Sequence, residues 1–199
     1  MSHTSSTSSQ PWHVWRRAFD HRATRPLPVV TSAREVPAAW RAPLAASLAV
    51  FQLGEAGEGR IAHQIDDCRL PAIDDDYRAA LKAFVREEGR HARILAAAVR
   101  ALGGRTLARQ WTERLFVRGR RLIGVRLKIV VLLAAELVGG VMYGALVQRL
   151  PDGALARALR EIRDDEEQHL AFHVDFLRRT TPPAWLGLAW LVVGAAASA

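Results

Sequence analysis

Cysteine is almost absent from this chain, because Cys68 is the only one among 199 residues. A single cysteine cannot form an internal disulfide, and it cannot build the cysteine clusters that hold structural zinc or iron–sulfur groups. Any metal bound by this chain must therefore be held by Glu, Asp and His side chains. One cysteine also fits a cytoplasmic setting.

Glycine and proline are scarce within the periodic segments of the chain. The 14 Gly and 9 Pro lie mostly near the ends and between those segments, and half of all residues are hydrophobic. Because Ala, Leu, Arg and Glu favour helices, we predict an all-α fold. We expect a disordered or arm-like segment at 1–36, one domain at 37–181, and an apolar C-terminal helix or anchor at 182–199.

The chain also lacks the features of several functional classes. Its first ten residues contain no basic region followed by an apolar run, so they do not resemble a secretory signal. The net charge of +8 is not accompanied by a zinc finger, an RNA-recognition sheet or a Gly-rich phosphate loop, and we expect no nucleic-acid partner. The positive charge fits either an anionic membrane surface or a generally arginine-rich composition.

Aromatic and basic residues alternate near the N-terminus. Trp12, Trp15 and Phe19 stand among arginines and histidines. This segment either touches lipid or a neighbouring subunit, or it folds over its own domain.

Four segments carry apolar residues at helical spacing. Asp74 is suited to begin the second and Gly103 to end it, and the turn at 151–153 makes the last two helices antiparallel neighbours. The basic residues 105–128 are a long crossover, either solvated or resting on anionic lipid or an acidic partner. The predicted helices span about 37–66, 74–102, 129–150 and 154–179.

Two of these helices carry a Glu followed three residues later by a His. The pairs are Glu88 with His91 and Glu166 with His169. A spacing of three places both side chains of a pair on one face of a helix, and here that face is otherwise apolar. Two such pairs predict a site for two metal ions.

The other two helices place carboxylates on apolar faces. Glu55 and Glu58 interrupt the apolar stripe of the first helix, which is costly unless they are paired or bind a cation. Glu136 lies in the middle of the third, which is apolar enough to resemble a membrane span. Its charge favours a fully buried helix with one metal ligand instead.

Three residues near Glu136 are further candidates for the site. Gly139 and Gly140 either leave space for a small substrate or dioxygen or allow close helix packing. Tyr143 lies on the same face as Glu136, and it either hydrogen-bonds near the site or fills the core.

The predicted metal site thus has six ligands, and each pair is preceded by a further carboxylate. We expect Asp165 to support His91, and Glu87 to support His169, by accepting a hydrogen bond from the second ring nitrogen. The alternative for each carboxylate is an ordinary salt bridge with an arginine. Four carboxylates balance two ferrous ions, and imidazole suits iron or manganese. The ligands are Glu55, Glu88, His91, Glu136, Glu166 and His169.

This pattern resembles the ferritin-like di-iron carboxylate superfamily, over about residues 40–180. The superfamily's four-helix bundle supplies one Glu from each of two helices and a Glu-x-x-His from each of the others. GEAGEGRIA at 54–62 and IRDDEEQH at 162–169 are similar to the demethoxyubiquinone hydroxylase branch, and the Gly-Glu step also resembles rubrerythrin. The resemblance implies that Glu55 is the ligand, that Glu58 is an auxiliary carboxylate, and that Arg60 is a nearby charge.

Three functions follow as expectations. The first is a di-iron oxidoreductase that uses dioxygen to hydroxylate or oxidise an apolar, membrane-associated substrate, with Glu58 or Glu136 shifting its coordination. The second is iron oxidation or peroxide removal, and the third is a non-catalytic metal-stabilised membrane-associated protein. Manganese or a mixed-metal pair would fit the same ligands. The apolar residues 182–199 are a fifth helix, an anchor at the inner face of the membrane, or a subunit contact in a homodimer.

Overall fold

The computed structural model describes residues 10–57, 65, 73–107 and 125–180, and these ranges contain five helices and no strand. The predicted all-α class is therefore confirmed. Glu58, Arg60, most of the basic crossover and the apolar residues 182–199 lie outside the described residues.

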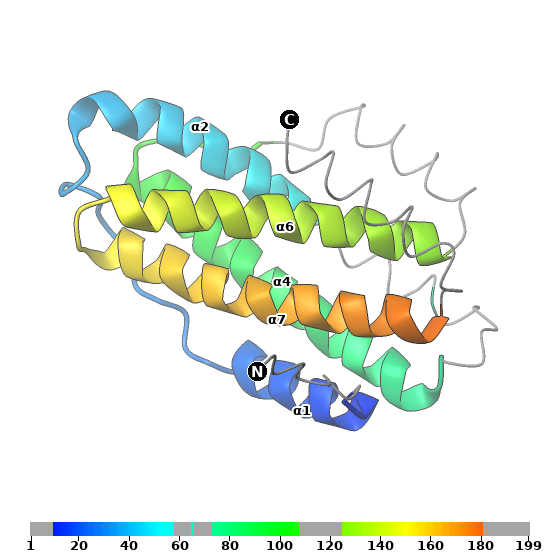
Figure 1. The fold of residues 1–199 in the computed structure, drawn as a ribbon. Helices are drawn as coiled ribbons and strands as arrows, with labels where there is room; N and C mark the ends of the chain where they lie inside the picture. Colours follow the sequence, from blue (N-terminus) through cyan, green and yellow to red (C-terminus); the bar gives the residue numbers. More distant parts are fainter. Residues whose placement is uncertain (1–9, 58–64, 66–72, 108–124, 181–199) are drawn as a thin grey trace, which may run out of the picture.

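Four long helices and one shorter N-terminal helix make up the described structure (Figure 1). Helix α4 packs against α1, α2 and α7, and α6 packs against α7. Helices α1 and α2 lie on opposite sides of the group formed by α4, α6 and α7 (Figure 1). The helices are α1 (Trp12–Ala23), α2 (Ala38–Glu55), α4 (Asp75–Ala101), α6 (Val125–Arg149) and α7 (Ala154–Thr180).

The two helices that carry the Glu-x-x-His pairs begin and end close to the predicted positions. The Asp74 side chain accepts a hydrogen bond from the Tyr77 backbone N–H at 2.7 Å, which caps the start of α4. Gly103 follows its end with a φ of 84°, a conformation that glycine adopts without steric cost. Helix α7 starts directly after the turn at 151–153 and ends at Thr180.

Helix α2 is shorter than predicted. It ends at Glu55 rather than near residue 66, and the backbone N–H of Ala56 and of Gly57 close the last turn on the carbonyls of Gln52 and Gly54. Glycine within a helix costs about 1 kcal/mol relative to alanine, so Gly54 and Gly57 weaken its continuation. Glu55 is therefore the last residue of α2 and not at the middle of a helix.

Helix α6 differs from the predicted helix in its first residue and in the extent of its burial. It begins at Val125, so the last four residues of the predicted crossover are helical. It is long and apolar enough to cross a membrane, with a mean hydropathy of 2.1, as core helices of soluble proteins can be. The prediction that this helix is fully buried is wrong, since Leu127, Val138 and Val141 are exposed. Its buried face carries Glu136 and Tyr143.

Helix α1 folds over its own domain, as the second of the two alternatives for the N-terminal segment predicts. Trp12, Trp15 and Phe19 are buried against aromatic rings of α4 and α7, among them Phe172. The Trp15 ring N–H donates to the Asp175 carboxylate at 3.1 Å. The aromatic side chains of α1 are thus part of the core of the domain.

Candidate metal centre

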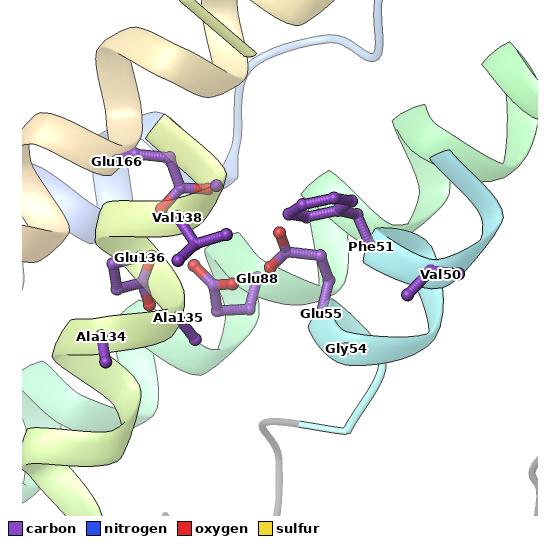
Figure 2. A pocket seen from close by; sticks show the side chains of 11 residues that line it. Val50, Phe51, Gly54, Glu55, Glu88, Ala134, Ala135, Glu136, Val138 and Glu166 are labelled. Carbon is purple, nitrogen blue, oxygen red and sulfur yellow. The ribbon is translucent and has the colours of Figure 1, made fainter. Parts of the chain in front are cut away.

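The six predicted metal-binding side chains come together between four helices. They project from the end of α2 and from the middle of α4, α6 and α7, and the carboxylates of Glu55, Glu88, Glu136 and Glu166 face one cavity (Figure 2). All are buried except Glu55, which is partly exposed. Helical spacing explains this meeting, because each lies on the buried face of its helix.

Three overlapping groups of these side chains could hold a metal ion. In each group, one oxygen or nitrogen atom per residue lies within 4.8 Å of the others. The second and third groups together contain all six residues and share Glu166, so the geometry has room for two ions with a shared carboxylate. The groups are Glu88, His91 and His169; Glu88, Glu136, Glu166 and His169; and Glu55, His91 and Glu166.

Both imidazoles point the same way relative to this group. Their Nδ1 atoms face the carboxylates: the Nδ1 of His169 lies 2.9 Å from Glu88 Oε1, and that of His91 lies 3.5 Å from Glu166 Oε1. Their Nε2 atoms face outward. The Nε2 of His169 lies 3.0 Å from Glu87 Oε2. The Nε2 of His91 lies 3.2 Å from Asp165 Oδ2. These contacts join the pairs expected from the sequence.

Several inward-facing atoms have no hydrogen bond of normal geometry to any other described residue. They include both carboxylate oxygens of Glu88, one of Glu166 and the Nδ1 of His91. A buried polar atom without a partner costs roughly 1–3 kcal/mol, and more if it is charged. Two divalent cations, one in each of the groups that together contain all six residues, would satisfy these atoms, so the residues present fit a metal site.

Burial and crowding raise the pKa of three carboxyl groups. Burial raises the pKa of Glu55, and it raises those of Glu88 and Glu136 well above the usual range. The charge of Glu55 adds to the effect on Glu88, and the charge of Glu166 adds to that on Glu136. The site without metal therefore retains protons that a cation would displace.

The pKa values of Glu166, His91 and His169 are shifted in favour of the charged form of each group. Burial would raise the pKa of Glu166, but hydrogen bonds from Glu136, His169 and His91 hold it well below the usual range. Burial would lower the pKa of His91, but hydrogen bonds to Asp165 and Glu166 raise it to about 9. Burial would lower the pKa of His169, but the charge of Glu88 and hydrogen bonds to Glu136, Glu166 and Glu87 together raise it well above its usual value.

Tyr143 contacts the cluster from α6. Its hydroxyl donates to Glu55 Oε1 at 3.2 Å, and burial raises the pKa of Tyr143, so the hydroxyl keeps its proton. Of the two alternatives for this residue, the structure shows the hydrogen bond near the site. The contact holds Glu55 at the C-terminal end of α2.

His173, one turn after His169, does not join the cluster. It is fully buried, and its Nε2 lies 3.9 Å from Glu136 Oε1, beyond hydrogen-bonding distance. Burial lowers the pKa of His173 to about 3, so the ring is neutral. It packs edge-on against Phe84 at 4.9 Å between ring centroids.

Two arginines that the sequence analysis did not single out lie behind the imidazoles. Arg22 pairs with Glu87 and Arg25 pairs with Asp165. Each carboxylate thus makes both of the contacts that the sequence left as alternatives, one with the histidine and one with an arginine. Sequence periodicity could not find these arginines, because Arg22 is in the last turn of α1 and Arg25 follows it, and the docking position of α1 is a long-range feature. The signal in the sequence was two arginines close behind the aromatic residues of this segment.

A cavity of about 370 Å³ reaches the carboxylates from the side of α2 and α6 (Figure 2). Its other lining residues are apolar or glycine, and four of them are exposed, so it opens at the surface; these are Val50, Gly54, Ala135 and Val138. Gly139 lines this cavity, whereas Gly140 lies where an added Cβ would be 3.8 Å from Glu166 Cβ. The space predicted at the glycine pair is therefore found at Gly139, and Gly140 accommodates α7.

No known protein family, curated protein or solved structure matches this chain. The predicted relation to the ferritin-like superfamily therefore rests on the residues and geometry described above.

The metal-free protein should lose stability as the pH rises from 6.5 to 9. The pKa of His91 is about 9 in the folded state and 6.5 ordinarily, so its contribution is full below pH 6.5 and is lost as pH rises through 9. The raised pKa values of Glu88 and Glu136 act in the same direction. Thermal unfolding at the two pH values tests this, with a fall of roughly 2–4 °C for each kcal/mol lost.

His91→Gln should reduce this pH dependence, whereas His21→Gln, at an exposed position of α1, should leave it unchanged. A melting temperature that stays constant or rises over this range would contradict the assigned shifts.

Proposed function

We propose that α2, α4, α6 and α7 form a ferritin-like four-helix bundle that holds two iron ions and uses dioxygen to oxidise an apolar substrate. The observation that carries the proposal is a difference in hydrogen bonding between the inward-facing and the outward-facing atoms of the cluster. The inward oxygens of Glu88 and the Nδ1 of His91 make no hydrogen bond of normal geometry, while the outward nitrogens of His91 and His169 have carboxylate partners. Histidines that bind metal are held in this way.

The donor set supports iron, with manganese or a mixed pair as the other candidates. It contains four carboxylates and two imidazoles and no thiolate, which suits these metals better than soft ones. Glu166 belongs to both of the groups that together contain all six residues, so it is the carboxylate placed to contact both ions. Bound iron would supply the electrons and the coordination positions that dioxygen activation requires.

The apolar cavity supports an organic substrate over iron or peroxide alone. Seven of its lining residues are apolar or glycine and four are the carboxylates. A ferroxidase needs a polar path for hydrated cations, and the described lining offers none outside the carboxylates. The apolar ones are Val50, Phe51, Gly54, Ala134, Ala135, Val138 and Gly139.

The reaction proposed is the insertion of one oxygen atom of dioxygen into a C–H bond of the substrate. The other oxygen atom leaves as water, and an external reductant supplies two electrons and two protons. The chain's own contribution is to bind the substrate in the apolar cavity and to exclude water from the carboxylates. Tyr143 holds Glu55 through its hydroxyl at the point where α2 ends.

Exposed apolar side chains near the cavity favour a membrane-borne substrate. Val138 and Val141 on α6 are 42% and 64% exposed, and Val50 on α2 is 59% exposed. Contact with the inner face of a membrane would cover these side chains and bring an apolar molecule to the cavity. This would place the protein in the cytoplasm, peripheral to the membrane.

Glu166→Gln should remove at least one of two bound metal ions per chain. Glu166 is buried and belongs to two of the groups, and an amide cannot supply the negative charge that the metals require. Glu167→Gln is the matched control, because Glu167 is the next residue and is exposed. The measurement is elemental analysis of protein purified with iron available.

Two metal ions in Glu167→Gln and no more than one in Glu166→Gln is the expected result. Equal metal content in the two variants, or far less than two ions in the unmodified protein, would refute the proposed centre.

Val138→Trp should suppress substrate oxidation without changing the metal content. Val138 lines the cavity at its exposed end, and a larger side chain there would obstruct entry. Val141→Trp is the control, because Val141 is on the same helix and exposed but does not line the cavity. Reduced, iron-loaded protein is mixed with dioxygen and a lipid extract, and oxidised products are measured by mass spectrometry.

The substrate assignment predicts at least a tenfold loss of product in Val138→Trp and little change in Val141→Trp. Equal product formation in both variants would show that the substrate does not enter between α2 and α6.

A further inference from the structure

Arg22 lies at the end of α1 and reaches into the layer behind His169. Its Nε donates to Glu87 Oε1 at 2.7 Å and one terminal nitrogen donates to Glu87 Oε2 at 3.1 Å. Glu87 Oε2 is the same oxygen that lies 3.0 Å from His169 Nε2. A two-point contact of this kind holds the carboxylate in one plane and also neutralises its negative charge. The orientation of Glu87 toward His169 therefore depends on Arg22.

Arg25 has the same relation to His91. One of its terminal nitrogens donates to Asp165 Oδ2, the oxygen that lies 3.2 Å from His91 Nε2. Each arginine also lies near the carboxylate that the other one binds. Arg22 Nε is 3.4 Å from Asp165 Oδ1, and a terminal nitrogen of Arg25 is 3.6 Å from Glu87 Oε1. Glu87 and Asp165 are almost fully buried, so these arginines are their cationic partners.

A side chain of α4 holds the backbone of the segment that carries Arg22 and Arg25. Arg90 is completely buried and donates to the backbone carbonyls of Arg25 at 3.2 Å and Pro26 at 2.7 Å. A terminal nitrogen of Arg90 also lies 2.5 Å from Glu161 on α7. Phe19, one turn before Arg22, packs against the ring of His169 at 5.7 Å between centroids. The position of α1 is thus set by contacts with the helices that carry the histidines.

The charges of the centre balance only when these arginines are included. The four inward carboxylates together with Glu87 and Asp165 carry six negative charges when ionised. Two divalent cations would supply four positive charges, and Arg22 and Arg25 supply the other two. Unbalanced charge in such a buried cluster costs several kcal/mol.

We propose that Arg22 and Arg25 are positioning residues of the metal centre, which hold Glu87 and Asp165 in the orientation that presents His169 and His91 to the metals. The N-terminal segment that carries these arginines then contributes to metal binding. Without Arg22, the two oxygens of Glu87 lose their fixed partner and the carboxylate turns from His169. This inference rests on the metal site proposed above.

Titration of the full chain with cobalt(II), followed by its visible absorption, tests the inference. Arg22→Gln and Arg25→Gln should each weaken cobalt binding by about three- to tenfold, less than the 10–100-fold typical of losing a direct hydrogen-bond partner of a ligand. Arg22→Lys keeps the charge and one hydrogen bond, so it should recover part of the loss. The absorption band should also change shape, because it reports the histidine ligation.

Arg86→Gln is the matched control. Arg86 on α4 pairs with Asp20 on α1, so it joins the same two helices, but both side chains are about half exposed and neither contacts Glu87 or Asp165. Its cobalt affinity should equal that of the unmodified chain. Thermal unfolding of each metal-free variant separates a loss of stability from a loss of metal binding.

A double-mutant cycle shows whether Arg22 acts through Glu87. In the Glu87→Gln background, Arg22→Gln should have little further effect on cobalt affinity. Unchanged affinity in Arg22→Gln, or a loss of equal size in the Glu87→Gln background, would overturn the inference while leaving the metal site in place. Failure of the unmodified chain to bind cobalt would overturn the metal site and this inference together.

Discussion

The burial of ionisable groups between the helices is the constraint on which the rest of this structure depends. Glu88, Glu136 and Glu166 are at most 6% exposed, and the imidazoles of His91 and His169 are fully buried among them. So many charged groups cannot be removed from water unless they are neutralised by protons, by paired charges or by cations. The raised pKa values of Glu88 and Glu136 are an instance of the first, and the arginines of the α1 segment provide the second. The inward atoms that make no hydrogen bond of normal geometry leave a place for the third.

The centre has two distinct sides, and they divide the functions proposed for it. On one side α1 brings Arg22 and Arg25 against the carboxylates that hold the outer nitrogens of the imidazoles. On the other side α2 and α6 border an apolar cavity that opens past Val50 and Val138 (Figure 2). In the function proposed, the first side fixes the ligand geometry and the second admits a substrate. Separate mutations can therefore affect metal binding and substrate entry independently.

Much of the centre was predictable because helical spacing is a local property of the sequence. The Glu-x-x-His pairs, Glu136 in an apolar run, and the crossed contacts of Asp165 with His91 and of Glu87 with His169 follow from which residues share a helix face. The end of α2 at Glu55 was mispredicted, because the stripe continues past Gly54 and Gly57 although the helix does not. The role of Arg22 was not visible in the sequence, since it depends on where α1 docks, 65 residues away from Glu87.

The most direct test of the central claim is anomalous diffraction at the iron edge from crystals of the iron-loaded protein. The account predicts two anomalous peaks per chain, enclosed by the side chains of α2, α4, α6 and α7. Each histidine should approach its peak through Nδ1, with Nε2 on the outer carboxylate. A single peak, no peak within the cluster, or histidines turned so that Nε2 faces the metal would contradict it.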